Sequence, residues 1–269
     1  MIHPLTWLYA PGDRPHVVAK ALACGADVVV IDLEDAVAPD RKEYARAATA
    51  ERLAEEQPVP VHVRINALDG PLAAEDLRAV AALPGVSGLR LPKVTSPAQV
   101  AGIAERTPGP LYALLETALG VEHAYAIAAA HPSLRGVSLG ESDLRADLGI
   151  REDAGLDWSR SRVIVAARAA GLAPPPQSVH PDIRDLEGLV ASCAHGRALG
   201  FLGRAAIHPR QLPIIERAYL PTQREIEEAE AVVKAAAAEP GAQALPDGRF
   251  VDAAVVAAAR RTLSLGRRL

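Results

Sequence analysis

Eight short aliphatic runs alternate with longer segments of helical period along most of this sequence. Such runs are typical of strands buried on both faces, and each intervening segment can lay an apolar stripe on a sheet. The alternation predicts βα units, and eight of them predict an α/β fold of the closed (β/α)8 TIM barrel type. The predicted strands are TWLYA ending at Ala10, DVVVIDL ending at Leu33, VPVHVRI ending at Ile65, GLRLPKV ending at Val94, LYALLET ending at Thr117, GVSLG ending at Gly140, PQSVH ending at His180 and RAAIHP ending at Pro209.

The alternation stops after Pro221, where a charged helical segment, a break rich in Gly and Pro and a last helix from about Ala253 follow. We therefore predict a barrel domain over residues 1–221 and a small helical extension over residues 222–269. The fold-level alternative is an open, doubly wound sheet, which normally has a glycine-rich phosphate loop after its first strand. The segment PGDRP at that place contains a single glycine, Gly12, so the barrel is favoured.

Charge and hydropathy exclude several classes of partner. The net charge is -4, and no run of Lys or Arg forms a nucleic-acid footprint. No apolar run reaches the roughly 18 residues of a membrane span, and the start of the chain does not resemble a signal peptide. We expect a cytoplasmic protein whose partners are small molecules or other subunits. Cys24 and Cys193 are isolated, which favours neither a disulfide framework nor a zinc site.

Ionisable side chains follow nearly every predicted strand, where the active sites of barrels lie. Scattered surface charge would favour the helices instead, so this rim is the expected functional face. The residues in question are Arg14, Asp32, Glu34, Asp35, Arg64, Asn66, Lys93, Glu116, Asp143, His180, Asp182 and His208.

Glu116 and Asp143 end consecutive predicted strands. Neighbouring strands lie about 4.8 Å apart, so both carboxylates can converge on one ion. Two carboxylates without cysteine or paired histidine suit a hard cation such as Mg²⁺. The alternative is that either acid caps the helix that follows it.

The three acids after the second strand, Asp32, Glu34 and Asp35, need positive partners, because an unpaired carboxylate cluster is costly to bury. Arg14, Arg64 and Lys93 are the candidates, and ion pairing is favoured over direct chemistry for these acids. Lys93 could also be a Schiff-base lysine, but so many nearby acids should keep its pKa high. His180 and His208 are each followed by a proline, which fixes the shape of the loop. A backbone or packing role for these histidines is as probable as a role as acid or base.

The motifs PGDRP, VVVIDLEDAV, VRIN, LPKV, LLETALGV, GESDLRADLG, VHPDIRDLEGL and AIHPRQL occur in this order and span almost the whole chain. Together they closely resemble the citrate lyase β-subunit-like branch of the HpcH/HpaI aldolase superfamily. The resemblance implies a TIM-barrel, Mg²⁺-dependent lyase acting on 3-hydroxyacyl-CoA thioesters such as citryl-, malyl- or citramalyl-CoA. It also implies a homotrimer or a hexamer formed by two trimers.

The resemblance assigns roles to individual residues. The metal-binding acids of the family fall on Glu116 and Asp143, and its carboxylate- and thioester-binding arginine falls on Arg64. Its CoA-contacting basic residues fall on Arg14 and Lys20, and we group Asp35 with these substrate-binding residues.

The tail GRFVDAAVVAAARRTL resembles the family's C-terminal lid, so Asp252 is expected to reach a neighbouring subunit's site as the acid/base. Without the resemblance, Asp252 would be only a helix N-cap. One departure from the family pattern is Ser142, which stands where an acid more often precedes the metal aspartate. It leaves the geometry of this loop and the substrate preference open.

Three alternatives to the lyase remain open at this stage. A water admitted to the same site would make the protein a malyl-CoA-type thioesterase. A class II aldolase would act on free 2-oxo acids without CoA. A non-autonomous β-subunit would work only inside a citrate lyase complex. The sequence does not choose among glyoxylate, pyruvate and oxaloacetate as the oxo-acid half.

Overall fold

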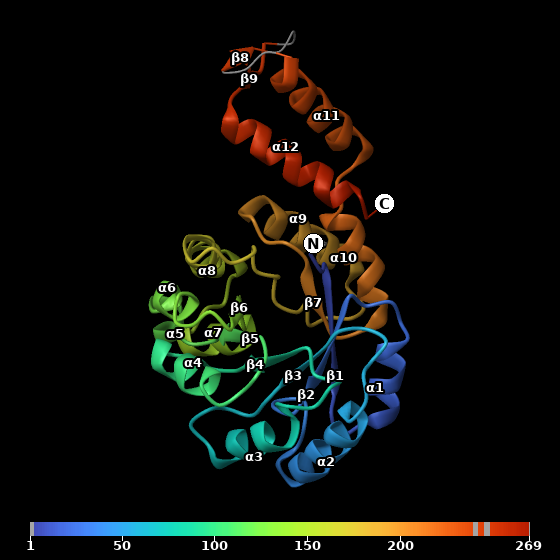
Figure 1. The fold of residues 1–269 in the computed structure, drawn as a ribbon, viewed down its shortest axis with the longest axis vertical. Coiled ribbons are helices and arrows are strands. Elements are labelled where there is room, and N and C mark those ends of the chain that lie inside the picture. Colours follow the sequence, from blue (N-terminus) through green and yellow to red (C-terminus); the bar gives the residue numbers. More distant parts are fainter. Residues whose placement is uncertain (1–2, 239–241, 245–247, 269) are drawn as a thin grey trace.

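The computed structural model describes residues 3–238, 242–244 and 248–268. Its main feature is a sheet of seven parallel strands in the order β6-β5-β4-β3-β2-β1-β7 (Figure 1). Each of the seven strands is followed by at least one α-helix before the next strand in the chain begins. The strands are β1 (Thr6–Pro11), β2 (Val28–Asp32), β3 (Val61–Arg64), β4 (Gly88–Leu91), β5 (Leu111–Leu115), β6 (Leu134–Leu139) and β7 (Arg204–Ala206).

The predicted closed eight-stranded barrel is wrong. The other seven predicted runs each contain a strand, but PQSVH contributes only one isolated bridge, from Gln177 to Arg204, within the described part of the chain. The three prolines Pro174–Pro176 precede this bridge, and proline has no N–H with which to donate to a strand ladder. On the other side, a hydrogen bond from the Glu141 N–H to Ser178 Oγ (3.2 Å) reaches this segment from two residues beyond the end of β6, not from the strand itself. The sheet therefore stays open between β6 and β7.

Twelve α-helices surround the sheet and form the C-terminal extension within the described residues. Local signals explain several of their starts: α4, for example, begins with a capping box in which Ser96 and Gln99 satisfy each other's backbone N–H groups. The helices are α1 (Pro15–Leu22), α2 (Lys42–Leu53), α3 (Pro71–Val80), α4 (Pro97–Ala104), α5 (Ala118–Glu122), α6 (Ala124–Ala128), α7 (Glu141–Leu148), α8 (Asp157–Ala169), α9 (Leu186–Leu199), α10 (Leu212–Tyr219), α11 (Gln223–Ala238) and α12 (Ala253–Gly266).

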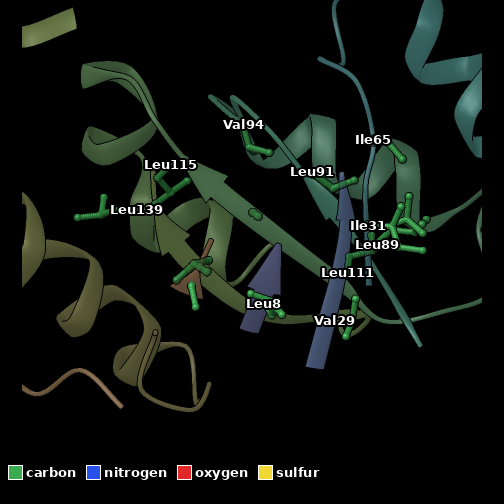
Figure 2. Packing of buried hydrophobic residues seen from close by; sticks show 14 of the residues in the cluster. Leu8, Val29, Ile31, Ile65, Leu89, Leu91, Val94, Leu111, Leu115 and Leu139 are labelled. Atoms are coloured by element: carbon green, nitrogen blue, oxygen red, sulfur yellow. The ribbon is translucent and has the colours of Figure 1, made fainter. Parts of the chain in front are cut away.

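The core is divided by the alternation of side chains along each strand. Residues such as Val29, Ile31 and Leu91 belong to one large cluster with the helices (Figure 2). Their neighbours Val28 and Val30 instead form a separate small cluster with Trp7 on the inner face of the sheet. Burying each aliphatic side chain contributes about 1.5–3 kcal/mol, so both faces of the sheet are held by apolar contacts.

The C-terminal extension is a pair of helices, α11 and α12, joined by a ribbon of β8 (Gln243–Ala244) and β9 (Phe250–Val251) (Figure 1). It has its own small core of Ala229, Val232, Val251 and Ala259. The end of α12 is tied to the main body by an ion pair between Arg268 and Asp27. Asp27 directly precedes β2, so the extension is attached at the edge where the strands begin.

No described helix combines the length and the apolar character needed to cross a membrane.

Candidate active site

The carboxyl ends of the strands surround a cavity of about 480 Å³, which we call the active-site cavity. Parallel strands end at the same edge of a sheet, so the loops that follow them bring distant parts of the chain together. Five ionisable side chains from the ends of four strands, β2, β3, β5 and β6, line it: Asp32, Asp35, Arg64, Glu116 and Asp143. The edge of the sheet where the strands end, which the sequence predicts to be the functional face, thus contains a cavity.

Arg64 is the centre of the ion pairs at this edge. Its Nε and Nη2 donate to the two carboxylate oxygens of Asp32 at 2.8 and 2.6 Å. Its Nη1 lies 3.0 Å from Glu34 and 3.6 Å from Asp35. Burial opposes the charged form of Arg64, but its hydrogen bonds with Asp32 outweigh this and raise the pKa. The predicted pairing of the strand 2 acids with Arg64 is confirmed.

Lys93 links the same acids to the neighbouring strands. Its Nζ lies 2.8 Å from Glu34 and 3.6 Å from Asp35 and Asp143. Partial burial disfavours its ammonium, but the hydrogen bond with Glu34 outweighs this and raises the pKa of Lys93. A lysine held in its charged form is a poor Schiff-base nucleophile. The supporting role predicted for Lys93 is therefore confirmed.

Glu116 is 2% exposed and has one backbone donor, the N–H of Lys93 at 3.1 Å. Lys93 itself has a left-handed backbone, with a φ of 51°. Burial, followed by the negative charge of Glu34, raises the pKa of Glu116 to about 7. Glu116 is thus a carboxylate without a sufficient positive neighbour, and a bound cation would favour its ionised form.

Gly140, at the N-terminus of α7, leaves the space that Glu116 occupies. A Cβ atom on Gly140 would lie 2.4 Å from Oε1 and from Cγ of Glu116. Asp143 follows in the first turn of α7, where it contacts Lys93. Gly140, not Asp143, occupies the N-cap position, so the predicted alternative that Asp143 caps this helix is wrong.

The donor set at Glu116 and Asp143 fits a hard cation. Among the described residues no group of three or more His, Cys, Asp or Glu side chains is arranged to hold a metal ion. The chain therefore offers two carboxylate ligands, and water or substrate oxygens would occupy the remaining coordination positions of the ion. This incomplete oxygen set is what Mg²⁺ commonly has in enzymes whose substrate is also a ligand.

The predicted CoA-contacting residues lie outside the active-site cavity. Arg14 precedes α1, and its side chain is 60% exposed and 4.0 Å from Asp13. Lys20 is exposed in the last turn of the same helix. Six residues of helix place Lys20 about 9 Å further along the α1 axis, away from the strand ends. The structure does not bring either residue to Arg64.

Asp252 lies far from this edge in its own chain. It is the N-cap of α12, and its Oδ1 accepts the Val255 N–H at 2.9 Å, as the capping alternative predicts. Arg268, two residues past the other end of α12, is held at Asp27 on the opposite edge of the sheet, and the fourteen residues of α12 span about 21 Å. The helix pair projects away from the sheet (Figure 1).

The two rim histidines serve the backbone. His208 accepts the Arg210 N–H through Nδ1 at 3.1 Å, and the carbonyl of His180 accepts from Gln211 at 2.9 Å. His180 Nε2 also lies 3.5 Å from Asp185.

Sequence reasoning missed the buried support of the rim. Arg160 of α8 is 2% exposed and donates to both oxygens of Glu141 at 2.9 and 2.8 Å. It also holds Asp153 and Asp157. On the other side, Lys42 donates to the carbonyls of Leu33 and Glu34 at 2.7 and 2.6 Å. The only available signal was an arginine in the middle of an amphipathic helix, which normally indicates a solvated face.

Comparisons with known proteins identify the family of this chain. The family model for HpcH/HpaI aldolase/citrate lyase matches residues 5–209. A (3S)-malyl-CoA thioesterase from Cereibacter sphaeroides is 37% identical over 275 residues, which cover 97% of this chain and 94% of that protein. A citrate lyase subunit beta-like protein from Mycobacterium tuberculosis is 38% identical over 265 residues, covering 96% of this chain and 93% of that protein.

A crystal structure of CitE from Mycobacterium tuberculosis, in complex with magnesium, acetoacetate and coenzyme A, superposes with a TM-score of 0.85. It is 38% identical to this chain and covers 98% of each. A relative of this similarity shares the fold over its full length, including the C-terminal extension.

Proposed function

Since this chain belongs to the HpcH/HpaI aldolase/citrate lyase family, we propose that it is a Mg²⁺-dependent carbon-carbon lyase. Its substrate would be a 3-hydroxyacyl-CoA thioester such as citramalyl-, malyl- or citryl-CoA, and its products acetyl-CoA and a 2-oxo acid. The observation that carries the proposal is the meeting of Glu116, Asp143 and Arg64 at one cavity of about 480 Å³.

Glu116 and Asp143 would hold the metal. A magnesium complex of a structure with a TM-score of 0.85 to this chain supports the choice of ion. When bound, Mg²⁺ supplies a Lewis acid and a template for the oxygens of the oxo-acid half. Lys93 keeps both acids in place, because its side chain lies 3.6 Å from Asp143 and its N–H lies 3.1 Å from Glu116.

Arg64 would orient the substrate carboxylate and the thioester oxygen. In the cleavage, the substrate hydroxyl would lose its proton to water and its oxygen would become the carbonyl of the 2-oxo acid. The bond between this carbon and the thioester α-carbon would break, and its electron pair would pass to the α-carbon as an enolate. A guanidinium fixed by Asp32 and Glu34 is already oriented, so it stabilises this charge without reorganisation. Asp35, which is 54% exposed, lies at the entrance of the same cavity.

Asp252 would deliver the proton that converts the enolate to acetyl-CoA, in the site of a neighbouring subunit. Attachment of α12 at the opposite edge of the sheet supports action on a neighbour, because about 21 Å of helix carries Asp252 away from its own body. This role requires an oligomer, and we propose a homotrimer or a hexamer. CoA would bind near Arg14 and Lys20.

The thioesterase is the second candidate, because the malyl-CoA thioesterase relative covers 97% of this chain. A lyase releases acetyl-CoA, whereas a thioesterase releases free CoA and leaves the carbon skeleton intact. The two products therefore separate the candidates directly. Activity of the isolated chain on a thioester would exclude the subunit that depends on a complex, and a requirement for CoA would exclude an aldolase on free 2-oxo acids.

The test is product analysis with purified protein on malyl-, citramalyl- and citryl-CoA, with Mg²⁺ and with EDTA. We expect acetyl-CoA from one thioester, only with the metal, and a loss of about 100-fold or more in Glu116→Gln. Glu122→Gln, which changes an exposed carboxylate on the neighbouring α5, is the matched control and should retain activity. Free CoA without acetyl-CoA would favour the thioesterase, and no product from any thioester would refute both.

A second test addresses Asp252 itself. Asp252→Asn keeps a good N-cap residue on α12 but removes the acid. We expect it to lose about 10²-fold or more in kcat, as for a general acid-base residue. Mixed oligomers of Asp252→Asn and Glu116→Gln should regain activity if the aspartate serves the neighbour's site. No recovery on mixing would show that both residues belong to one chain's site.

A further inference from the structure

A second cavity of about 330 Å³ lies at the opposite end of the inner face of the sheet, and we call it the lower cavity. Residues that directly precede strands, such as Pro60 and Ser87, line its mouth. Its walls are mostly apolar or aromatic and include Trp7, Val28 and Tyr112. Its size and lining are those of small-molecule sites, in which a few polar groups fix the ligand's orientation.

Arg90 of β4 is the inner wall of this cavity and also reaches the active-site cavity. It is 3% exposed, and its Nε has no hydrogen-bond partner. Its Nη1 lies 3.5 Å from the hydroxyl of Tyr9, and its guanidinium lies 5.8 and 5.7 Å from the ring centroids of Tyr9 and Tyr112. Within the described part of the chain, no carboxylate forms an ion pair with it.

Arg64 is the register partner of Arg90 on the neighbouring strand β3, and its surroundings differ from those of Arg90. The carboxylates of Asp32 and Glu34 compensate the charge of Arg64. Those acids are already engaged by Arg64 and Lys93, and two tyrosine rings offset only part of the desolvation of Arg90. Arg90 is thus a buried cation for which the described part of the chain supplies no counter-charge.

His62 adds a second unused polar group to the same space. It is 4% exposed and stacked on Tyr112 at a centroid distance of 4.3 Å, and its Nδ1 has no partner. Burial, followed by the charge of Arg90, lowers the pKa of His62 well below its ordinary value. Gly88 makes this stack possible, because a Cβ atom there would lie 2.7 Å from the Tyr112 ring.

We propose that the lower cavity binds a small organic carboxylate, whose charged end pairs with Arg90 and whose apolar body lies against Trp7, Val28 and Tyr112. The charge of Arg90 requires an anion, and the apolar walls favour a ligand with a hydrocarbon body over an inorganic ion. Arg135, exposed at the rim of the cavity, adds positive charge at the entrance.

A purely structural role for Arg90 does not explain this arrangement. The end of a barrel-type sheet where strands begin usually serves stability. An apolar residue of similar volume in place of Arg90 would serve stability better than an unpaired guanidinium. The site does not depend on the proposed lyase activity, because the residues that would hold the body of the ligand line only the lower cavity, Glu116 lines only the active-site cavity, and no metal is needed.

Trp7 makes the site measurable without any assay of activity. The chain has two tryptophans, and the other one, Trp158, is exposed and can be replaced by Phe. In a Trp158→Phe background, hexanoate should change the emission of Trp7 in a saturable way, with calorimetry as an independent readout. Hexanamide has the same shape without the charge, and we expect it to bind at least about tenfold more weakly.

Four variants locate the binding. Arg90→Met should weaken hexanoate binding by about tenfold or more, whereas Arg90→Lys keeps a charge and should bind measurably. Arg135→Met, at the rim, should bind like the parent within about twofold, and Glu116→Gln should leave binding unchanged because it alters only the active-site cavity.

Equal binding of hexanoate and hexanamide by the parent protein would overturn the proposal even if Arg90→Met does not fold. So would unaltered binding by a folded Arg90→Met, or the absence of saturable binding in both fluorescence and calorimetry. A loss of hexanoate binding in Glu116→Gln would place the ligand in the active-site cavity and equally refute a separate site.

Discussion

Gly140→Ala is the substitution whose effect on the metal site follows most directly from the structure. Gly140 has a φ of -99°, which alanine adopts without strain, so the change acts only through the added Cβ atom. That atom would lie 2.4 Å from Cγ and Oε1 of Glu116, whereas an ordinary contact begins at 3.4 Å. Glu116 must therefore move by about 1 Å.

A displacement of this size should affect metal binding more than folding. We expect Mg²⁺ affinity to fall by about 10- to 100-fold and kcat/KM by about 10²-fold, since metal ligands and catalytic groups tolerate little displacement. Overpacking should cost about 1–3 kcal/mol of unfolding free energy. The measurements are calorimetric titration with Mg²⁺, thermal unfolding and the thioester assay.

The matched control is Gly102→Ala. Gly102 lies inside α4, and no atom lies within 4 Å of a Cβ placed there. This substitution should leave Mg²⁺ binding unchanged and stabilise the helix by up to about 1 kcal/mol. If Gly140→Ala binds Mg²⁺ as tightly as the parent protein, then Glu116 is not a metal ligand in the conformation described above.

Two further predictions test the electrostatics of the site. The pKa of Glu116 is raised to about 7, above the ordinary value of 4.5, so its carboxyl is mostly protonated below pH 7 and must lose a proton to bind a cation. Mg²⁺ affinity should therefore fall as the pH drops from 8 to 6. The metal-free protein should lose stability as the pH rises from about 4.5 through 7, because ionising a buried carboxyl costs free energy. In thermal melts, Glu116→Gln should make the stability less dependent on pH over this range. Arg160→Met removes the partner of Glu141, Asp153 and Asp157 and should lower the free energy of unfolding by about 3–5 kcal/mol, measured by urea denaturation. The exposed Arg151→Met should change it by less than about 0.5 kcal/mol, and a similar small loss in Arg160→Met would refute the buried network.

Much of the fold is readable from local patterns. Seven of the predicted runs contain strands because a buried parallel strand needs an unbroken apolar stretch, which is a property of a few consecutive residues. PQSVH does not form a strand, because the prolines before Gln177 remove backbone donors. Whether such a segment pairs with β6 and β7 also depends on where these two strands lie. Closure of the sheet depends on whether strands that are far apart in the sequence come together, and the local hydrophobic period does not determine this.

For the candidate site, too, the sequence determined some features and the tertiary structure decided others. The sequence by itself determined that ionisable residues such as Arg64, Glu116 and Asp143 follow the strands, because strand ends are set by local apolar period and parallel strands share one edge. Only the tertiary structure decided that Arg64 is paired with carboxylates while, among the described residues, no carboxylate pairs with its neighbour Arg90. Ion pairing falls off within a few ångströms, so a charge acquires its role only when packing brings the partner within reach.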